Sequence, residues 1–464
     1  MTTADPHSLV RIGCASGFAD DRSDAGVPVV RELARYEGPR FLIYETLAER
    51  TLALAQLRRR QDPEAGASEA IERFLRPVLA ECLASGIRIV GNFGAANPRA
   101  GARTIRRLAT ELGYSDIRIA VVEGDDISGA FSHEELKTRE MDGDLLANAA
   151  EIVSANAYIG AQGIAQGLDA GADVVVAGRV ADPSLALGPL IHAFGWRLDD
   201  WDRLAAGTLA GHLLECGSQV TGGYFADPGM AEVPDLAEVG YPIAEILADG
   251  TITLTKPPGT GGRVDRETVT EQLLYEIHDP AAYLTPDVVL DLTEVAIEVV
   301  GKDRVRVAGA RGRPRPERLK ATVCVDGGHL AEGEISYAGA NAARRAALAI
   351  QVVQERMARR CPGLVVRADA IGIASLFHPA GPAALGPALA ASRCEDVRVR
   401  LSAASSDRAG PEELLHEVRA LYCAGPGGGA GIRTRLTHRV ASASCLVERE
   451  RVEPRMSILE AHHG

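Results

Sequence analysis

Short apolar runs alternate with amphipathic stretches through the first half of the chain. The apolar runs have the length of strands, and most end in glycine or polar residues: Val10–Cys14, Arg40–Tyr44, Ile87–Val90, Ile117–Val122 and Asp173–Ala177. Segments with helical spacing separate them: Leu47–Arg60, Ser68–Ser85, Arg99–Leu112 and Ala157–Ala170. This alternation predicts an α/β fold, with a mostly parallel, doubly wound sheet whose two faces are covered by helices.

Polar residues follow each of these predicted strands. They are Ser16, Glu45, Asn92, Asn97, Glu123, Asp125, Asp126, Arg179, Asp182 and Ser184. Any one of them alone is more typical of a helix cap or a turn. Because ligands bind beyond the carboxyl ends of parallel strands, the whole set predicts one shared pocket. We assign Asp125 and Asp182 to catalysis, and we assign to substrate binding Ser16, Asn92, Asn97, Glu123 and Arg179.

The pattern becomes less regular after about Pro234. Predicted strands are Thr251–Thr255, Val288–Asp291, Arg304–Val307, Lys320–Val325, Ile371–Leu376 and Val397–Ala403, and predicted helices are Ala338–Arg359 and Pro411–Tyr422. This grouping is typical of an α+β domain. Prolines and glycines concentrate near residues 230–245. We therefore expect a Rossmann-like α/β domain over residues 1–235 and an α+β domain over residues 236–464.

Composition limits the classes of function. The chain has 464 residues, of which 46% are hydrophobic, and this length exceeds what one core usually serves. A formal net charge of −13 disfavours a nucleic-acid partner, because such binding depends on Lys and Arg. No uninterrupted apolar run reaches the length of a membrane span, and residues 1–8 lack the pattern of a signal peptide. The eight cysteines form no C-x-x-C pair, so reduced thiols in a cytoplasmic protein are expected.

The segment from Ala205 to Tyr224 combines reactive side chains with very few charges, which is typical of a pocket wall. If it is helical, His212 shares one face with Glu215 and Cys216, at spacings of three and four residues. That face brings together a base, an acid and a thiol. The second histidine of a zinc helix is missing, so we predict no metal site. We assign to catalysis His212, Glu215 and Cys216, and to substrate binding Gln219 and Thr221.

A glycine-rich loop over Lys256–Arg263 resembles an ATPase phosphate loop only in part. It has Gly262 where that motif has its phosphate-binding Lys, and Arg263 where it has Ser or Thr, so ATP hydrolysis is disfavoured. Backbone N–H groups and two flanking cations would still suit a phosphate or carboxylate. We therefore assign to substrate binding Lys256, Thr260 and Arg263.

Two other glycine-rich stretches give weaker signals. Gly425–Gly431 precedes Arg433 and Arg435, but it follows a predicted helix, and the end of that helix explains most of it. Anion binding there is the alternative. Gly13–Gly17 lacks the dinucleotide fingerprint, so no redox cofactor is expected.

Several longer runs resemble one family. They are Arg11–Gly17, Asn92–Pro98, Val121–Asp126, Asp173–Leu190, Asp200–Gly223, Leu254–Glu276 with Arg304–Arg313, and Tyr337–Ala343. Together they resemble the acyclic terpene utilisation protein A family, from about Arg11 to Leu446. The resemblance implies a place in bacterial breakdown of citronellol and geraniol through acyl-CoA thioesters. Many relatives carry a further ferredoxin-like domain, so a small ferredoxin-like partner subunit is expected here.

These observations favour an enzyme that acts on a branched acyl-CoA or a similar acyl thioester, by hydration or by carbon–carbon cleavage of a 3-hydroxyacyl unit. Such chemistry requires an acid, a base and donors to an enolate-like oxygen, and no cofactor. One alternative is acyl transfer or hydrolysis through Cys216 activated by His212. Another is a non-catalytic subunit that binds a thioester. We expect a homo-oligomer, with no membrane or nucleic-acid partner.

Overall fold

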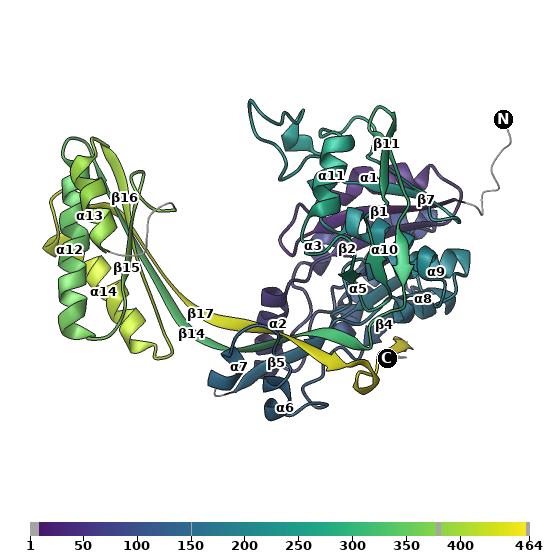
Figure 1. The fold of residues 1–464 in the computed structure, drawn as a ribbon, viewed down its shortest axis with the longest axis horizontal. Coiled ribbons are helices and arrows are strands. Elements are labelled where there is room, and N and C mark those ends of the chain that lie inside the picture. The colour runs from purple at the N-terminus through teal and green to yellow at the C-terminus, as the bar shows by residue number, and fades with distance from the viewer. Residues whose placement is uncertain (1–8, 150, 377–381, 461–464) are drawn as a thin grey trace. The chain divides into compact units, whose positions relative to one another are not determined.

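The computed structural model describes residues 9–149, 151–376 and 382–460 (Figure 1). Residues 1–8, which the signal-peptide interpretation concerned, lie outside that description. The chain forms two compact units: unit 1 comprises residues 1–324 and 442–464, and unit 2 comprises residues 325–441. The second unit is therefore inserted into the first.

A ten-stranded sheet forms the centre of unit 1, in the order β11-β12-β8-β7-β1-β2-β3-β6-β4-β18. Its five middle strands are parallel: β1 (Leu9–Gly17), β2 (Arg40–Glu45), β3 (Arg88–Gly91), β6 (Val174–Ala177) and β4 (Ile119–Glu123). The flanking strands are antiparallel: β7 (Ile243–Leu247), β8 (Ile252–Thr255), β12 (Arg304–Ala308), β11 (Ala296–Gly301) and β18 (Arg455–Ile458). The α/β character is confirmed, but the sheet is mixed rather than mostly parallel.

Helices pack on this sheet because its buried strands present apolar side chains in both directions. One set contributes to a core with the sheet: α1 (Gly26–Ala34), α3 (Ile71–Leu75), α4 (Leu79–Ser85) and α5 (Pro98–Glu111). A second set is α8 (Gln162–Asp169), α9 (Ser184–Phe194) and α10 (Trp201–Glu215). Val121 of β4 lies in the first core, whereas its neighbour Val122 contacts Gly163 of α8.

Smaller elements complete unit 1. They are α2 (Glu49–Gln61), α6 (His133–Lys137), α7 (Leu145–Asn148), β5 (Ile152–Ala157), α11 (Arg266–Leu274), and the 3₁₀ helices η2 (Gly217–Thr221), η3 (Leu236–Glu238) and η4 (Arg449–Arg451). A three-stranded sheet contains β13 (Arg311–Arg313), β10 (Val289–Asp291) and β9 (Tyr283–Leu284).

The structure differs from the sequence prediction in three places within unit 1. The predicted helix Ser68–Ser85 is two helices: α3 ends at Leu75 and α4 begins at Leu79, and Pro77 between them has no N–H to continue the helical hydrogen bonds. The predicted helix Ala157–Ala170 starts only at Gln162, because residues up to Ala157 form β5. The predicted domain boundary at residue 235 falls inside unit 1, since β7 pairs with β1 and continues its sheet.

Unit 2 follows a βαββαβ order with one further helix, α13, between its second and third strands. Its elements are β14 (Arg318–Ala338), α12 (Ala342–Arg360), β15 (Arg367–Ile371), α13 (Pro382–Ala391), β16 (Asp396–Ser405), α14 (Ala409–Ala424) and β17 (Ala430–Glu448). The sheet order β15-β16-β14-β17 is that of a ferredoxin-like fold. Figure 1 shows the three helices against the sheet, and their apolar faces form one core with it. The predicted strand Ile371–Leu376 is wrong, because β15 ends at Ile371 and the chain then turns back.

Candidate functional site

Several of the polar residues at the carboxyl ends of the parallel strands contact one another. Ser16 Oγ, after β1, donates to the Glu45 carbonyl at 2.9 Å. Asn92 Nδ2, after β3, donates to Glu45 Oε1 at 2.9 Å. The backbone N–H of Arg179, after β6, donates to Asp125, after β4. Asp125 also accepts from Asn156 Nδ2 at 2.8 Å.

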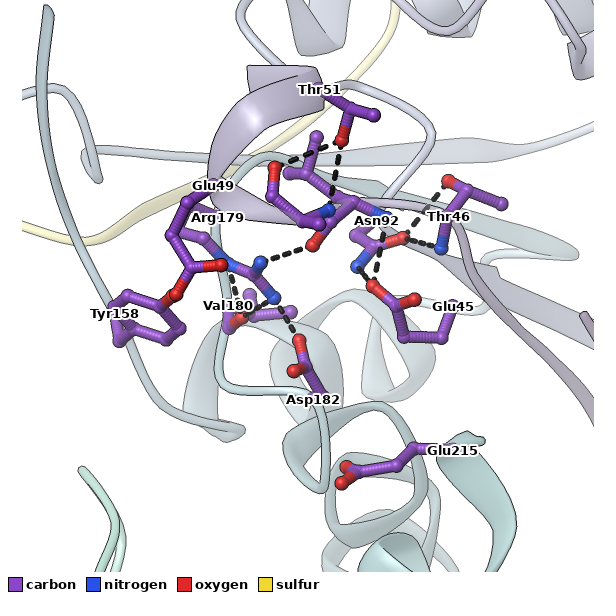
Figure 2. Close-up of polar contacts among 12 residues, drawn as sticks. Glu45, Thr46, Glu49, Thr51, Asn92, Tyr158, Arg179, Val180, Asp182 and Glu215 are labelled. Carbon is purple, nitrogen blue, oxygen red and sulfur yellow. Dashed lines mark hydrogen bonds and ion pairs between the residues drawn. The ribbon is translucent and has the colours of Figure 1, made fainter. Parts of the chain in front are cut away.

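Arg179 is the centre of this cluster (Figure 2). Only 1% of its side chain is exposed, and its guanidinium donates to the carbonyls of Leu47 and Val180 and to the carboxylate of Asp182. The same group lies 4.6 Å from the ring centroid of Tyr158. A guanidinium with so many internal acceptors holds Asp182 in place rather than binding substrate directly.

Two glycines, one within α10 and one at the end of β1, allow this helix to approach the cluster. A Cβ atom at Gly211 would lie 2.3 Å from the carbonyl oxygen of Pro183, next to Asp182. A Cβ atom at Gly17, the last residue of β1, would lie 2.3 Å from the backbone of Cys216. Both contacts require glycine. The C-terminal end of α10 is therefore pressed against two of the strand ends.

His212 and Glu215 form a buried pair on one face of α10, as predicted. Nδ1 of His212 lies 3.3 Å from Glu215 Oε1, and its Nε2 lies 3.2 Å from the carbonyl oxygen of Leu273. Burial lowers the pKa of His212 and raises that of Glu215, which the charge of Asp182 raises further. The pair is therefore neutral, with Nε2–H donating to Leu273 and the Glu215 proton directed to Nδ1.

Glu215 Oε2 has no hydrogen-bond partner among the described residues although it is buried. A buried polar atom without a partner costs about 1–3 kcal/mol and needs an explanation. In Figure 2, Asp182 lies between Arg179 and Glu215. Asp182 is the more accessible of the two carboxyls, with 34% of its side chain exposed, against 10% for Glu215. Asp182 can therefore be reached from solvent.

Glu45 is a third carboxyl group in the same cluster. Burial and the nearby charge of Asp182 raise the pKa of Glu45 to about 8, although Arg179, Asn92 and the backbone N–H of Leu47 oppose the rise. Burial also raises the pKa of Asp182, which the charge of Arg179 opposes. Several carboxyl groups around one cation cannot all be ionised cheaply, so protons are retained near neutral pH.

The raised pKa of Glu45 predicts a pH-dependent stability. Folded protein keeps a proton that unfolded protein releases between pH 4.5 and about 8, so the contribution of Glu45 falls as pH rises through this window. Glu45→Gln keeps the acceptor oxygen for Asn92 and Leu47 but removes the titration. We expect the difference in urea midpoint, Glu45→Gln minus wild type, to become larger from about pH 5 to about pH 9. A constant difference between the two proteins would contradict this assignment.

Cys216 lies at the end of α10 and is partly exposed. Burial of the thiol and the neighbouring carboxyl of Glu215 raise the pKa of Cys216. The thiol is therefore protonated at neutral pH, which opposes nucleophilic attack.

Some predicted site residues have structural contacts instead. Asn97 accepts from the N–H of Ala100 and so caps α5, and Glu123 pairs with Arg99 at 2.9 Å. The hydroxyl of Thr221 donates to backbone carbonyls at 2.6 and 2.9 Å, one of them that of Gly240. Gln219 hydrogen-bonds Tyr275, near Cys216. Ser184 donates to Asp287 at 2.7 Å.

The cationic side chains of the loop Lys256–Arg263 also have partners in the protein. Lys256 Nζ donates to the carbonyl of Thr260 at 2.8 Å and lies 3.7 Å from Asp303. Arg263 pairs with Asp265 at 2.8 Å and with Glu267 at 2.6 Å. These internal partners neutralise much of the positive charge on which the predicted anion site depends.

The sequence interpretation missed four residues, Tyr158, Glu49, Gln272 and Tyr283, that lie around Arg179 and His212. Tyr158 donates to Glu49 Oε1 at 2.5 Å and stacks on Arg179. Gln272 Nε2 donates to the carbonyl of His212 at 2.8 Å, and the ring of Tyr283 lies 5.7 Å from that of His212. Tyr158 follows β5, and recognising that strand was the one available signal. Tyr283 and Gln272 come from segments distant in the sequence.

Within the described residues, no group of three or more His, Cys, Asp or Glu side chains is arranged to hold a metal ion. No described helix has both the length and the apolar composition for crossing a bilayer.

Comparison with known proteins identifies the family. Neither a curated protein nor a solved structure gives a significant match. The sequence does match the acyclic terpene utilisation family protein AtuA over residues 10–458, nearly the whole chain. The strand ends and α10 described above lie inside the matched region, and the chain belongs to the AtuA family of acyclic terpene utilisation proteins.

Proposed function

We propose that this chain is an acid–base enzyme acting on a branched acyl-CoA or related acyl thioester. The reaction is hydration, or carbon–carbon cleavage of a 3-hydroxyacyl unit. One observation carries the proposal: a neutral, buried Glu215 whose Oε2 has no partner, next to an Asp182 fixed by Arg179. Membership of a family of acyclic terpene utilisation supports a branched acyl substrate.

The two carboxyl groups have complementary roles in cleavage. Asp182, paired with Arg179 and reachable from solvent, takes the proton of the 3-hydroxyl group. The bond between C2 and C3 then breaks, C3 becomes a carbonyl carbon, and the electron pair moves into the thioester as an enolate. Glu215, a carboxylic acid kept neutral by burial, turns its O–H from Nδ1 of His212 to the substrate and supplies the proton that the enolate oxygen needs.

Hydration uses the same groups in a different order. Asp182 takes a proton from water as the water oxygen adds to C3 of an enoyl thioester, Glu215 stabilises the resulting enolate through its O–H, and the protonated Asp182 then returns its proton to C2. His212 is 1% exposed and lies behind Glu215, so it acts on substrate only through that carboxyl. We describe His212 as a positioning residue that accepts a hydrogen bond from the Glu215 O–H before that proton is transferred.

A panel of acyl-CoA esters incubated with the purified chain tests the proposal. We expect turnover of a branched enoyl-CoA or 3-hydroxyacyl-CoA, detected by mass spectrometry of the products. Cys216→Ala should retain most of that activity, because the wild-type thiol is protonated. An acyl adduct on Cys216, together with loss of turnover in Cys216→Ala, would instead establish the thiol as nucleophile. Binding of the esters without turnover would leave a non-catalytic thioester-binding subunit.

A further inference from the structure

The open face of the unit 2 sheet, opposite its helices, carries exposed arginines. Ile432 and Leu436 of β17 pack against the core of unit 2. Side chains alternate along a strand, so Arg433 and Arg435 project from the opposite face. Both are exposed, and neither forms a side-chain hydrogen bond or ion pair with the described residues.

Two more arginines share this face. Arg398 of β16 lies opposite Ser336 of β14 in the register and donates to its hydroxyl at 2.9 Å and to the carbonyl of Gly431 in β17 at 3.3 Å. Arg398 also pairs with Glu334 of β14 at 2.5 Å, so within the described residues Arg433 and Arg435 are the members of this face that carry unpaired positive charge. Arg400 is two residues further along β16 and pairs with Asp369. We refer to Arg398, Arg400, Arg433 and Arg435 as the arginine face.

Unit 2 differs in charge from the rest of the chain. It has 14 arginines, no lysine and 11 aspartates and glutamates, which gives a formal net charge of +3. The whole chain carries −13. The guanidinium group binds carboxylates through two parallel hydrogen bonds, so arginine suits an acidic protein surface.

Unit 1 contains a segment with the opposite properties, which we call the acidic loop (residues 224–238). It contains Asp227, Glu232, Asp235 and Glu238 and no Lys or Arg. Its side chains Tyr224 and Met230 are 88% and 86% exposed. The carboxylates of Asp227 and Asp235 make no side-chain hydrogen bond or ion pair within the described part of the chain. Exposed aromatic and Met side chains beside charge are typical of protein interfaces.

We propose that the arginine face of one copy binds the acidic loop of a second copy of this chain. A reciprocal arrangement, in which each copy contributes both surfaces, closes a dimer with two identical contacts. Direct pairing of two β17 edges is disfavoured, because it would place arginines opposite each other. The strands of the arginine face present no Phe, Tyr or Trp among their described outward residues, which disfavours single-stranded nucleic acid as the occupant.

Sedimentation of the full chain at two salt concentrations tests this proposal. We expect a dimer at about 0.05 M salt and dissociation towards monomer at about 0.5 M, where exposed charges are screened. Arg433→Glu combined with Arg435→Glu should give a monomer at both concentrations. Adding Asp227→Arg and Glu232→Arg to that variant restores opposite charges, and the dimer should return.

The matched control is Arg359→Glu with Arg408→Glu, which makes the same charge change on α12 and at the start of α14. It should remain dimeric at low salt. A wild-type chain that is monomeric at low salt, or a dimer that persists in the Arg433→Glu, Arg435→Glu variant, would overturn the proposal. So would an association that disappears on treatment with nuclease.

Discussion

Glu215→Gln is expected to lower turnover of the acyl thioester by about 10²- to 10⁴-fold, the usual contribution of a positioned acid. Glutamine preserves the shape of the side chain but carries no proton that can be transferred. Burial holds Glu215 neutral, so replacing it with a neutral amide removes little electrostatic stabilisation of the fold. Steady-state kinetics should therefore show a loss in kcat, while thermal unfolding changes little.

Glu245→Gln provides the matched control for that substitution. Glu245 is also buried, but it pairs with Arg11 at 2.7 Å and with Arg304, away from the strand ends. Its substitution should lower stability and leave kcat near the wild-type value. Wild-type turnover by Glu215→Gln would exclude Glu215 as the acid.

His212→Gln should shift the pH profile of kcat, because His212 acts through the Glu215 proton.

Arg179→Met is expected to lower the free energy of unfolding of unit 1 by about 3–5 kcal/mol. The guanidinium is fully buried, and its removal leaves the carboxylate of Asp182 and the carbonyls of Leu47 and Val180 without a donor. The loss is costly because the two carbonyls stay buried without a donor, while Asp182, about a third exposed, keeps a charge without its partner. Arg179→Lys should recover only part of this loss, since lysine lacks the planar fork of donors.

The measurement is direct because Trp196 and Trp201, the two tryptophans of the chain, both lie in unit 1. Urea unfolding followed by tryptophan fluorescence therefore reports on this unit. Adding Asp182→Asn to Arg179→Met should restore part of the stability, because it removes the unpaired charge. Arg197→Met removes an exposed pair with Asp199 and should cost less than about 1 kcal/mol. Equal free energies of unfolding for the Arg179→Met and Arg197→Met proteins would show that Arg179 does not stabilise unit 1.

The parallel strands of unit 1 were predictable because each contains a short, largely apolar run, as in Val174–Ala177. β5 was missed because Ser154 and Asn156 interrupt its apolar pattern, and because it pairs with β14 rather than with the predicted sheet. The boundary at residue 235 was misplaced for a related reason. Antiparallel strands such as β7 give no local sign of which sheet they join.

The candidate site was predictable where topology alone places a residue. Asp182 and Asn92 follow parallel strands, and that rule brings them together. The raised pKa of Glu45 was not predictable, since it depends on burial and on Asp182. The predicted anion site at Lys256 depends on unpaired charge, and the lysine side chain instead lies near Asp303, which only tertiary structure brings close.

The insertion of unit 2 has a consequence for the order of folding during synthesis. Unit 2 is one continuous stretch, residues 325–441, and emerges from the ribosome before Arg455. The sheet of unit 1 is completed only when β18 pairs with β4, as in the pairing of Arg455 with Glu123. We therefore expect the inserted unit to fold first, while the β4 edge awaits its last strand and depends on chaperones to prevent mispairing.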